Sequence, residues 1–344
     1  MKKLKIGIIG LGRLGFSHAV NISEKIKGVE LFAACGSDPD RLNKNQQLLD
    51  IPVITTDYEE FIKMDELDGI VIASASSLHC EHLIKALKAG VRNIFIEKPI
   101  ALNGEEIIRL EKELPKYEAN IQVGHHRRYD PSYIEASKKI QKGYIGTPIS
   151  VRNDNRDFYF DPEFFRRFSP KSGGTILDTG SHDYDMIRWL LGTEARSIYG
   201  LGGKYVFDFL DEFNDVDNAS LLMEFDNGMM GQFSYSRSCK YAYHVETEIH
   251  GTEGVLRICT EPSNNRLVSI DDKGAHKTFF KDFYDLYKNC YHDEMVDFLD
   301  CIREGRKPPV TAEDGIKSVR WALYATEAVL GKKIVYTDSP LPMV

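Results

Sequence analysis

The pattern of apolar and polar residues divides the chain into two parts. Over about the first 120 residues, short apolar runs alternate with stretches whose apolar residues recur at helical spacing. Five runs are predicted to form strands: KLKIGIIG, VELFAACG, VITT, LDGIVIAS and VRNIFIE. Each run is followed by a predicted helix, the first over residues 14–27. Strands and helices that alternate in this way require a parallel sheet with right-handed crossovers, so this part is predicted to be a doubly wound α/β sheet.

The second part, after about residue 125, has the pattern of an α+β domain. GTPISVRND predicts a strand, and GGTILDTGSHDYDMIRWLLG predicts a helix. Strand-like runs separated by turn residues follow, and Asn227-Gly228 is a strong hairpin signal. Two amphipathic helices are predicted at the C-terminal end, in CYHDEMVDFLDCIREG and EDGIKSVRWALYATEAVLG. We therefore expect a large open, mainly antiparallel sheet with a helix on one face.

Composition and charge restrict the possible partners. Hydrophobic residues make up 42% of the chain and charged residues 28%, which is typical of a globular protein. The net charge of −8 argues against nucleic acid or an anionic membrane as the main partner. No stretch approaches the ~20 apolar residues of a membrane span. The start, MKKLKIGIIGLG, begins like a signal peptide, but glycines interrupt its apolar run, so a strand is expected instead.

The cysteines indicate a reduced environment. They form no CxxC pair and no metal-ligand spacing, so neither a disulfide framework nor a metal site is expected. The six are Cys35, Cys80, Cys239, Cys259, Cys290 and Cys301. A cytoplasmic protein is the expectation.

The hexamer GLGRLG matches G-x-G-x-x-G where that motif requires, after the first strand and at the start of the first helix. Gly10 permits a tight turn, Gly12 lets the backbone approach a pyrophosphate, and Gly15 lets helix and strand pack closely. Arg13 and Leu14 lie between the last two glycines. The N–H groups at the helix start would face the phosphates. The hexamer thus predicts a dinucleotide site, although a structural turn can have the same sequence.

The identity of the nucleotide depends on the end of the second strand. An acidic residue about 20 positions beyond the glycines binds the ribose 2′-hydroxyl and favours NAD. Asp38 is the candidate, and NAD is the predicted cofactor. In another register Asp38 caps the next helix and Ser37 occupies the strand tip, which would tolerate the 2′-phosphate of NADP.

The chain is predicted to form two domains. The first is a Rossmann domain over 1–123, and the second is a substrate-binding and oligomerisation domain over 124–344. The C-terminal helices are able to pack back on the first domain.

Two segments carry candidate chemistry. Glu97-Lys98-Pro99 follows the fifth strand, at the sheet edge where open α/β sheets bind ligands, although most lysines are simply solvated. In the predicted helix of the second part, Asp178, His182 and Asp185 share an arc of about 60°. A carboxylate beside an imidazole can fix the tautomer and orientation of the ring. A solvated stripe or a helix cap would explain the same pattern.

Five segments occur in an order that resembles the Gfo/Idh/MocA oxidoreductases: GLGRLG, SLHCEHLIKALKAG, EKP, GHHRRYDPSY and GGTILDTGSHDYDMIRWLLG. The resemblance extends over essentially the whole chain. Within the family, EFNDVDNA and SRSCKYAYHVETEIHGTEG look most like myo-inositol 2-dehydrogenases. The resemblance implies a Rossmann domain joined to an α/β domain whose open sheet carries substrate on one face and a subunit contact on the other, with homotetramers common.

By position, the resemblance makes Lys98, Asp178 and His182 the catalytic residues, with a cis peptide before Pro99. It also implies looser contacts with cofactor or substrate. Those near the cofactor are Ser74, His79 and Glu97, besides Gly10, Gly12, Arg13, Leu14, Gly15, Ser37 and Asp38. Those near the substrate are His126, Arg127, Asn153 or Asp154, and Tyr241. Inositol dehydrogenases often have an apolar residue at the position of His126, so the polyol itself stays open.

The expected reaction is hydride transfer between a nicotinamide and a secondary alcohol of a cyclic polyol such as inositol. His182 would be the base, because an imidazole pKa lies near working pH. Asp178 would hold the ring, and Lys98 would stabilise the developing alkoxide. Three alternatives remain: the same chemistry on an aldose, deoxysugar or nucleotide sugar; a non-catalytic NAD(P)-binding regulator; and a methyltransferase, which would leave EKP and DTGSH unexplained. A homo-oligomer, dimer or tetramer, is expected.

Overall fold

The computed structural model describes residues 3–159 and 161–343. The chain divides into two compact units. Unit 1 contains Met1–His126 and Asn289–Val319, and unit 2 contains Arg127–Lys288 and Arg320–Val344. The division after His126 lies close to the expected boundary at residue 123. Residues 289–319, near the C-terminal end, belong to unit 1.

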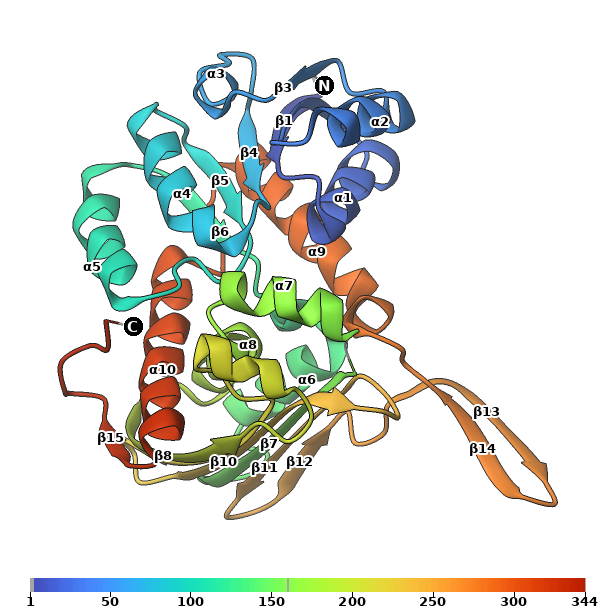
Figure 1. Cartoon of the computed structure of the whole chain (residues 1–344), viewed down its shortest axis with the longest axis vertical. Helices are drawn as coiled ribbons and strands as arrows, with labels where there is room; N and C mark the ends of the chain where they lie inside the picture. Colours follow the sequence, from blue (N-terminus) through green and yellow to red (C-terminus); the bar gives the residue numbers. More distant parts are fainter. Residues whose placement is uncertain (1–2, 160, 344) are drawn as a thin grey trace. The chain divides into compact units, whose positions relative to one another are not determined.

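Unit 1 contains a six-stranded parallel sheet in the order β3-β2-β1-β4-β5-β6 (Figure 1). Its strands are β1 (Leu4–Ile9), β2 (Val29–Cys35), β3 (Val53–Thr55), β4 (Gly69–Ile72), β5 (Asn93–Ile96) and β6 (Asn120–Val123). This order is that of the doubly wound dinucleotide-binding fold, so the predicted Rossmann-type sheet is confirmed. The sixth strand was not predicted.

Helices connect these strands. They are α1 (Arg13–Val20), η1 (Asn21–Lys25), α2 (Pro39–Leu49), α3 (Tyr58–Phe61), η2 (Ser76–Leu78), α4 (His79–Lys88), α5 (Gly104–Glu113), η3 (Leu114–Lys116) and η4 (His126–Tyr129). The first predicted helix, 14–27, is therefore an α-helix followed by one π-helical stretch. Helix α9 (Phe283–Glu304) crosses the division between the units. Its Met295, Phe298 and Leu299 are buried in the same apolar cluster as Ile6 and Ile8 of β1, which explains why this part of α9 belongs to unit 1.

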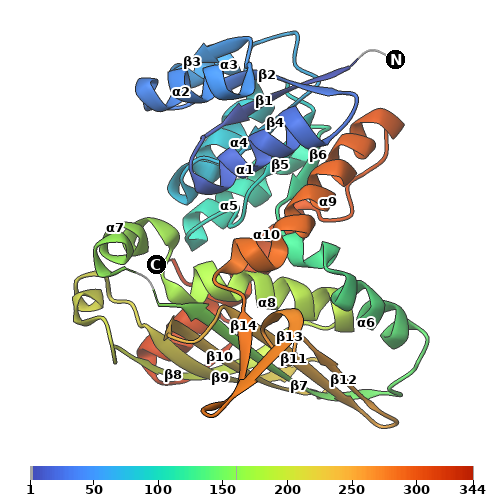
Figure 2. The ribbon, with the colours of Figure 1, turned by 90° about the vertical axis from the view of Figure 1, so that its right-hand side faces the viewer.

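Unit 2 contains a seven-stranded sheet in the order β12-β11-β7-β10-β9-β8-β15 (Figure 2). The strands are β7 (Pro148–Phe158), β8 (Ala195–Gly203), β9 (Asn218–Phe225), β10 (Met230–Cys239), β11 (His244–Gly251), β12 (Val255–Ile258) and β15 (Ile334–Tyr336). All neighbours are antiparallel except β7 and β10. The predicted open, mainly antiparallel sheet is thus confirmed. The Asn227-Gly228 turn joins β9 to β10, with Gly228 at φ +81°.

The remaining elements of unit 2 are α6 (Pro131–Gln141), α7 (Pro162–Ser172), α8 (Thr175–Leu191), η5 (Asp208–Phe213) and the hairpin β13 (Ser263–Asp271) with β14 (Gly274–Phe279). Helix α10 (Ala312–Gly331) crosses the division between the units. Helix α8 packs on the sheet through Tyr184, whose ring lies 5.8 Å from that of Phe233 on β10. None of the helices formed by the described residues is long and apolar enough to cross a membrane.

Candidate active site

The turn from β1 to α1 has the geometry that a dinucleotide requires. Gly10 adopts φ +89°, and a Cβ there would lie 2.4 Å from the carbonyl oxygen of Ala73. A Cβ on Gly15 would lie 1.9 Å from the carbonyl oxygen of Gly10, so the helix can approach the turn only because this residue is glycine. In contrast, a Cβ on Gly12 would have no heavy atom within 4 Å. The space next to Gly12 is therefore open to a ligand.

The start of α1 also suits an anion. Gly12 is the N-cap, so no side chain caps the helix, and the first turn carries no acidic residue. The N–H groups of a helix start attract phosphate. The residues present thus fit the pyrophosphate of a dinucleotide.

Asp38 is the N-cap of α2. Its Oδ1 accepts a hydrogen bond from the backbone N–H of Arg41 at 3.0 Å, and its side chain is half exposed. Strand β2 ends at Cys35, and Ser37 is exposed beyond it. The sequence left open whether Asp38 binds ribose or caps the helix, and the structure places it at the cap, where its Oδ2 lies 3.6 Å from Arg41 Nε.

Ser74 and His79 follow β4. The His79 ring is buried, and its nitrogens bond the carbonyl oxygens of Pro99 (Nδ1, 2.8 Å) and Ser74 (Nε2, 3.0 Å). Burial lowers the pKa of His79. This ring therefore joins the loop after β4 to the loop after β5. The Ser74 hydroxyl bonds His82 Nδ1 at 3.0 Å.

Lys98 lies in the loop after β5, at the carboxyl edge of the sheet, and its peptide bond to Pro99 is cis, as the resemblance implied. The Lys98 N–H donates to Glu97 Oε2 at 3.3 Å. Glu97 is buried, and its Oε1 lies 2.5 Å from His18 Nε2. His126, a predicted substrate residue, is buried in unit 1 with its ring 4.3 Å from that of Tyr291.

In unit 2, Asp178 and His182 lie on helix α8, as predicted. The residue that fixes the helix start is Asp215, whose carboxylate accepts from the backbone N–H of Thr175 at 3.0 Å. The Ser169 hydroxyl of α7 donates to the same carboxylate at 3.0 Å. Burial raises the pKa of Asp215. Helices α7 and α8 are thus joined directly ahead of Asp178, by an aspartate for which sequence analysis predicts no role.

The partner of Asp178 is Arg237 of β10, which sequence analysis missed. The Arg237 Nη2 donates to Asp178 Oδ2, and its Nη1 donates to Asp157 of β7 at 2.5 Å. Arg237 is buried. Burial alone would lower its pKa, but the carboxylates of Asp178 and Asp157 raise the pKa of the guanidinium overall. The carboxyl group of Asp178 therefore lies beside a permanent cation.

The other two aspartates of α8 are structural. Asp183 is buried and accepts from Arg127 Nη1 at 2.5 Å and from Asn155 Nδ2 at 2.8 Å. Arg127 also donates to the Tyr243 hydroxyl at 3.1 Å, so this predicted substrate residue lies inside unit 2. Asp185, one of the three residues of the predicted arc, accepts from Arg128 Nε at 2.8 Å.

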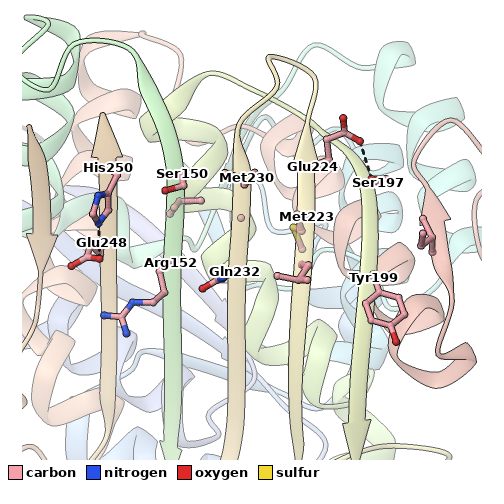
Figure 3. Close-up of a pocket in the computed structure, with 14 residues that line it drawn as sticks. Ser150, Arg152, Ser197, Tyr199, Met223, Glu224, Met230, Gln232, Glu248 and His250 are labelled. Atoms are coloured by element: carbon pink, nitrogen blue, oxygen red, sulfur yellow. Dashed lines mark hydrogen bonds and ion pairs between the residues drawn. The ribbon is translucent and has the colours of Figure 1, made fainter. Parts of the chain in front are cut away.

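The structure separates Asn153 from Asp154. Successive side chains of a strand point to opposite faces. Asn153 lies on the α8 face and accepts from the Thr247 hydroxyl at 2.7 Å. Asp154 lies on the other face, where it pairs with Arg152 at 3.3 Å (Figure 3 shows that face). Of the two, Asn153 is therefore the one we retain as a substrate candidate.

Tyr241 lies in the loop between β10 and β11, and its side chain is exposed. Its hydroxyl bonds His244 Nδ1 at 3.1 Å. Of the predicted substrate residues, Tyr241 is the only exposed one, because Asn153, His126 and Arg127 are all buried.

The glycine turn of unit 1 has the geometry of a dinucleotide site, and helix α8 of unit 2 carries Asp178 and His182 four residues apart. Residues 4–125 match the oxidoreductase family described as an NAD-binding Rossmann fold, and residues 137–336 match its C-terminal alpha/beta domain. The chain belongs to this family, the Gfo/Idh/MocA oxidoreductases. The predicted family, enzyme class and NAD cofactor are thereby confirmed.

Relatives of known activity cover nearly the whole chain. An NAD(+)-dependent scyllo-inositol 2-dehydrogenase of Bacillus subtilis is 32% identical over 95% of this chain and 94% of its own length. A myo-inositol 2-dehydrogenase of Thermotoga maritima is 29% identical over 96% of this chain and 98% of its own. The crystal structure of scyllo-inositol dehydrogenase from Lactobacillus casei, with bound NAD(H) and scyllo-inositol, has a TM-score of 0.93 at 32% identity and covers 98% of this chain and all of that one.

Proposed function

We propose that this protein is an NAD-dependent dehydrogenase that oxidises a secondary alcohol of a cyclic polyol such as inositol. The observation that carries the proposal is the ion pair of Asp178 with buried Arg237, one helical turn from His182, in a chain whose relatives oxidise inositols. A helix of purely structural role has no need of a carboxylate held ionised beside an imidazole. Lys98, Asp178 and His182 are the proposed catalytic residues.

Dinucleotide binding falls to the turn between β1 and α1. Gly12 leaves space for the pyrophosphate, and the uncapped start of α1 supplies N–H groups to it. Asp38 and Ser37, beyond β2, are the proposed contacts for the ribose end. NAD, when bound, accepts hydride at its nicotinamide ring.

The proton is handled by the chain itself. His182 takes the proton from the alcohol oxygen, because a neutral imidazole is a base near neutral pH. Asp178 stabilises the imidazolium that forms, and Arg237 keeps Asp178 ionised in this step. Lys98 places its ammonium group against the oxygen, where it stabilises developing negative charge.

We also propose that the protein is a homo-oligomer, with the open face of the unit 2 sheet as a subunit contact. A groove on this face is lined by exposed apolar side chains, including Tyr199, Leu222, Met230 and Ile334 (Figure 3). Exposed apolar patches of this kind mark interaction sites. The proposed state is a homotetramer. Light scattering measures the oligomeric state, and Leu222→Lys tests the contact because it places a charge in this groove. The control Ile108→Lys changes an exposed side chain of α5.

The proposed location is the cytoplasm. All six cysteines are free, five of them buried and Cys259 partly buried. Free thiols in this number are typical of a reducing compartment.

The test of the activity is a screen of inositol isomers, aldoses, deoxysugars and nucleotide sugars, each with NAD and with NADP. The expected result is NADH formation with one or more inositols. Turnover only with aldoses or nucleotide sugars would show that the substrate is another sugar and not a cyclic polyol. Tight NAD binding without turnover on the whole panel would indicate a regulator.

A further inference from the structure

Three buried ionisable side chains lie together behind Lys98. His18 comes from α1, Glu97 from the end of β5 and Glu294 from α9, and all three belong to unit 1. His18 and Glu294 are fully buried and Glu97 is 3% exposed. One ligand atom from each of the three lies within 4.8 Å of the other two. No step of the proposed reaction uses His18 or Glu294.

The cluster is closed in by aromatic rings. The His18 ring makes edge contacts with Phe95, at 5.2 Å, and with Tyr291, at 6.1 Å. A Cβ on Gly124 would lie 3.0 Å from Glu97 Oε2, so the glycine leaves room for this carboxylate. The other titratable groups near the cluster are Tyr291, His126 with its ring tilted against that of Tyr291, His79 and Lys98.

The charges inside the cluster are unbalanced unless a proton is shared. Glu97 Oε1 lies 2.5 Å from His18 Nε2, so one hydrogen bond joins the carboxyl group of Glu97 to the imidazole. Among the described residues none donates a hydrogen bond to either carboxyl oxygen of Glu294. A buried carboxylate without a partner is far costlier than a neutral carboxyl. Burial, and then the negative charge of Glu97, raise the pKa of Glu294 well above its ordinary value.

The alternative explanation of the cluster is a metal ion bound by the three side chains. Bonds of about 2.1 Å to a tetrahedral zinc would hold ligand atoms about 3.4 Å apart. The His18 nitrogen and the Glu97 oxygen are 2.5 Å apart, which is a hydrogen-bond distance. The geometry therefore suits a proton between the two atoms and leaves no room for a metal.

We propose that His18, Glu97 and Glu294 form a proton-sharing cluster that positions Lys98, with Glu294 as a neutral carboxylic acid. Glu97 is the link, because its Oε2 accepts from the Lys98 N–H at 3.3 Å while His18 holds its Oε1. A second negative charge at Glu294 would compete with Glu97 for the His18 proton. The neutral acid thus keeps Glu97 aimed at the backbone of Lys98. The cluster acts through Lys98, so these three are positioning residues, and only their link to turnover rests on the proposed function.

The protonation state is tested without any substrate. The infrared difference spectrum between the wild type and Glu294→Gln, at pH 7, is expected to contain the carbonyl band of a protonated carboxyl. The control Glu118→Gln changes an exposed carboxylate and is expected to give only carboxylate bands. A wild type without the protonated band, or one that retains a stoichiometric metal after purification, overturns the proposal.

The pH dependence of unfolding gives a second measurement. Because the pKa of Glu294 is raised in the folded state, the folded protein holds a proton that the unfolded chain loses above its ordinary pKa. Stability from this group is complete below about pH 4 and falls as pH rises. Glu294→Gln is expected to remove that fall, whereas Glu294→Ala, which leaves a cavity, lowers stability at every pH. Parallel curves for wild type and Glu294→Gln contradict the proposal.

The link to Lys98 is tested by kinetics once a substrate is known. We expect Glu97→Gln to lower kcat by about 10- to 100-fold, as misplacement of a catalytic group does, with the Kd for NAD within about threefold. Glu294→Gln is expected to retain about tenfold more activity than Glu294→Ala. Equal activity of those two variants overturns the positioning role. If no polyol is turned over, the spectroscopic and unfolding results still decide the protonation state, so the two proposals fail separately.

Discussion

The guanidinium of Arg237 bridges two carboxylates, that of Asp178 on α8 and that of Asp157 on β7. The bridge fixes α8 against the sheet at the helical turn that precedes His182. It also means that the charge of Asp178, four residues before His182 on α8, is partly compensated. We expect this balance to set how strongly Asp178 raises the basicity of the His182 ring.

Arg237→Met removes the cation from between two carboxylates. Breaking a buried pair leaves uncompensated charge and typically costs about 3–5 kcal/mol. The free energy of unfolding, from urea titration at pH 7, is expected to fall by about that amount. Lys85→Met is the control, because its ion pairs with Glu59 and Glu81 are exposed and such pairs contribute about 1 kcal/mol or less. Equal losses in the two variants would contradict the bridging role of Arg237.

His182→Ala removes the proposed base. General-base catalysis typically contributes about 10²–10⁴-fold, so kcat on the true substrate is expected to fall within that range. NAD binding, measured by fluorescence titration, is expected to change little, because His182 belongs to unit 2 and the glycine turn to unit 1. His276→Ala, on the exposed hairpin of β13 and β14, is the matched control. Unchanged turnover of His182→Ala would refute the assignment.

Lys98→Met removes the proposed ammonium, and kcat is expected to fall about as far as in His182→Ala. Lys98→Arg keeps the positive charge, so a smaller loss is expected, together with a shifted pH–rate profile. The comparison of the two variants separates charge from shape. Equal, complete loss in both would indicate that Lys98 acts through its position alone.

The fold could be predicted from the sequence where burial produces a clear pattern of apolar residues. Strands buried on both faces appear as continuous apolar runs, and Asn-Gly marks a hairpin, so the parallel sheet and the β9–β10 turn could be predicted. Strand β6 was missed because NIQV is short and half polar. Part of α9 belongs to unit 1 because it packs against β1. The two elements lie hundreds of residues apart in the sequence, so no local pattern reveals this contact.

The site residues that were predicted together are those that lie close together in the sequence. Asp178 and His182 are four residues apart, so one helical turn explains them. Arg237 lies 59 residues from Asp178 and 80 from Asp157. It alternates in phase with Phe233 and Tyr235 of β10, so strand alternation could have marked it as buried, but not its partners. Glu294 was missed because an acid in an amphipathic helix is usually exposed. Strand alternation could have separated Asn153 from Asp154, had the inward face of β7 been assigned first.

The glycines of the turn allow folding and binding to be separated. A Cβ at Gly15 would overlap the Gly10 carbonyl, so Gly15→Ala is expected to lower the melting temperature markedly. A Cβ at Gly12 meets no protein atom, and φ there is −69°, so Gly12→Ala is expected to fold normally. It would occupy the space proposed for the pyrophosphate, and we expect the Kd for NAD to rise by about tenfold or more. Gly254→Ala is the control for a glycine outside the turn, because a Cβ there makes only ordinary contacts, the nearest at 3.6 Å. A normal Kd for Gly12→Ala would contradict the assignment.

His82 makes unit 1 sensitive to acid. Burial, and then His79 and Lys85, lower the pKa of His82 to about 4 in the folded protein. The unfolded chain takes up this proton near pH 6.5, so its contribution to stability is complete above that pH and is lost as pH falls towards 4. The loss is expected to reach at most about 3 kcal/mol, and burial of His79 acts in the same direction. Urea titrations between pH 7 and pH 4 measure it. His82→Gln is expected to flatten the curve, and His276→Gln, on the exposed hairpin, to leave it unchanged. A wild-type curve that stays level over this range would show that His82 titrates alike in both states.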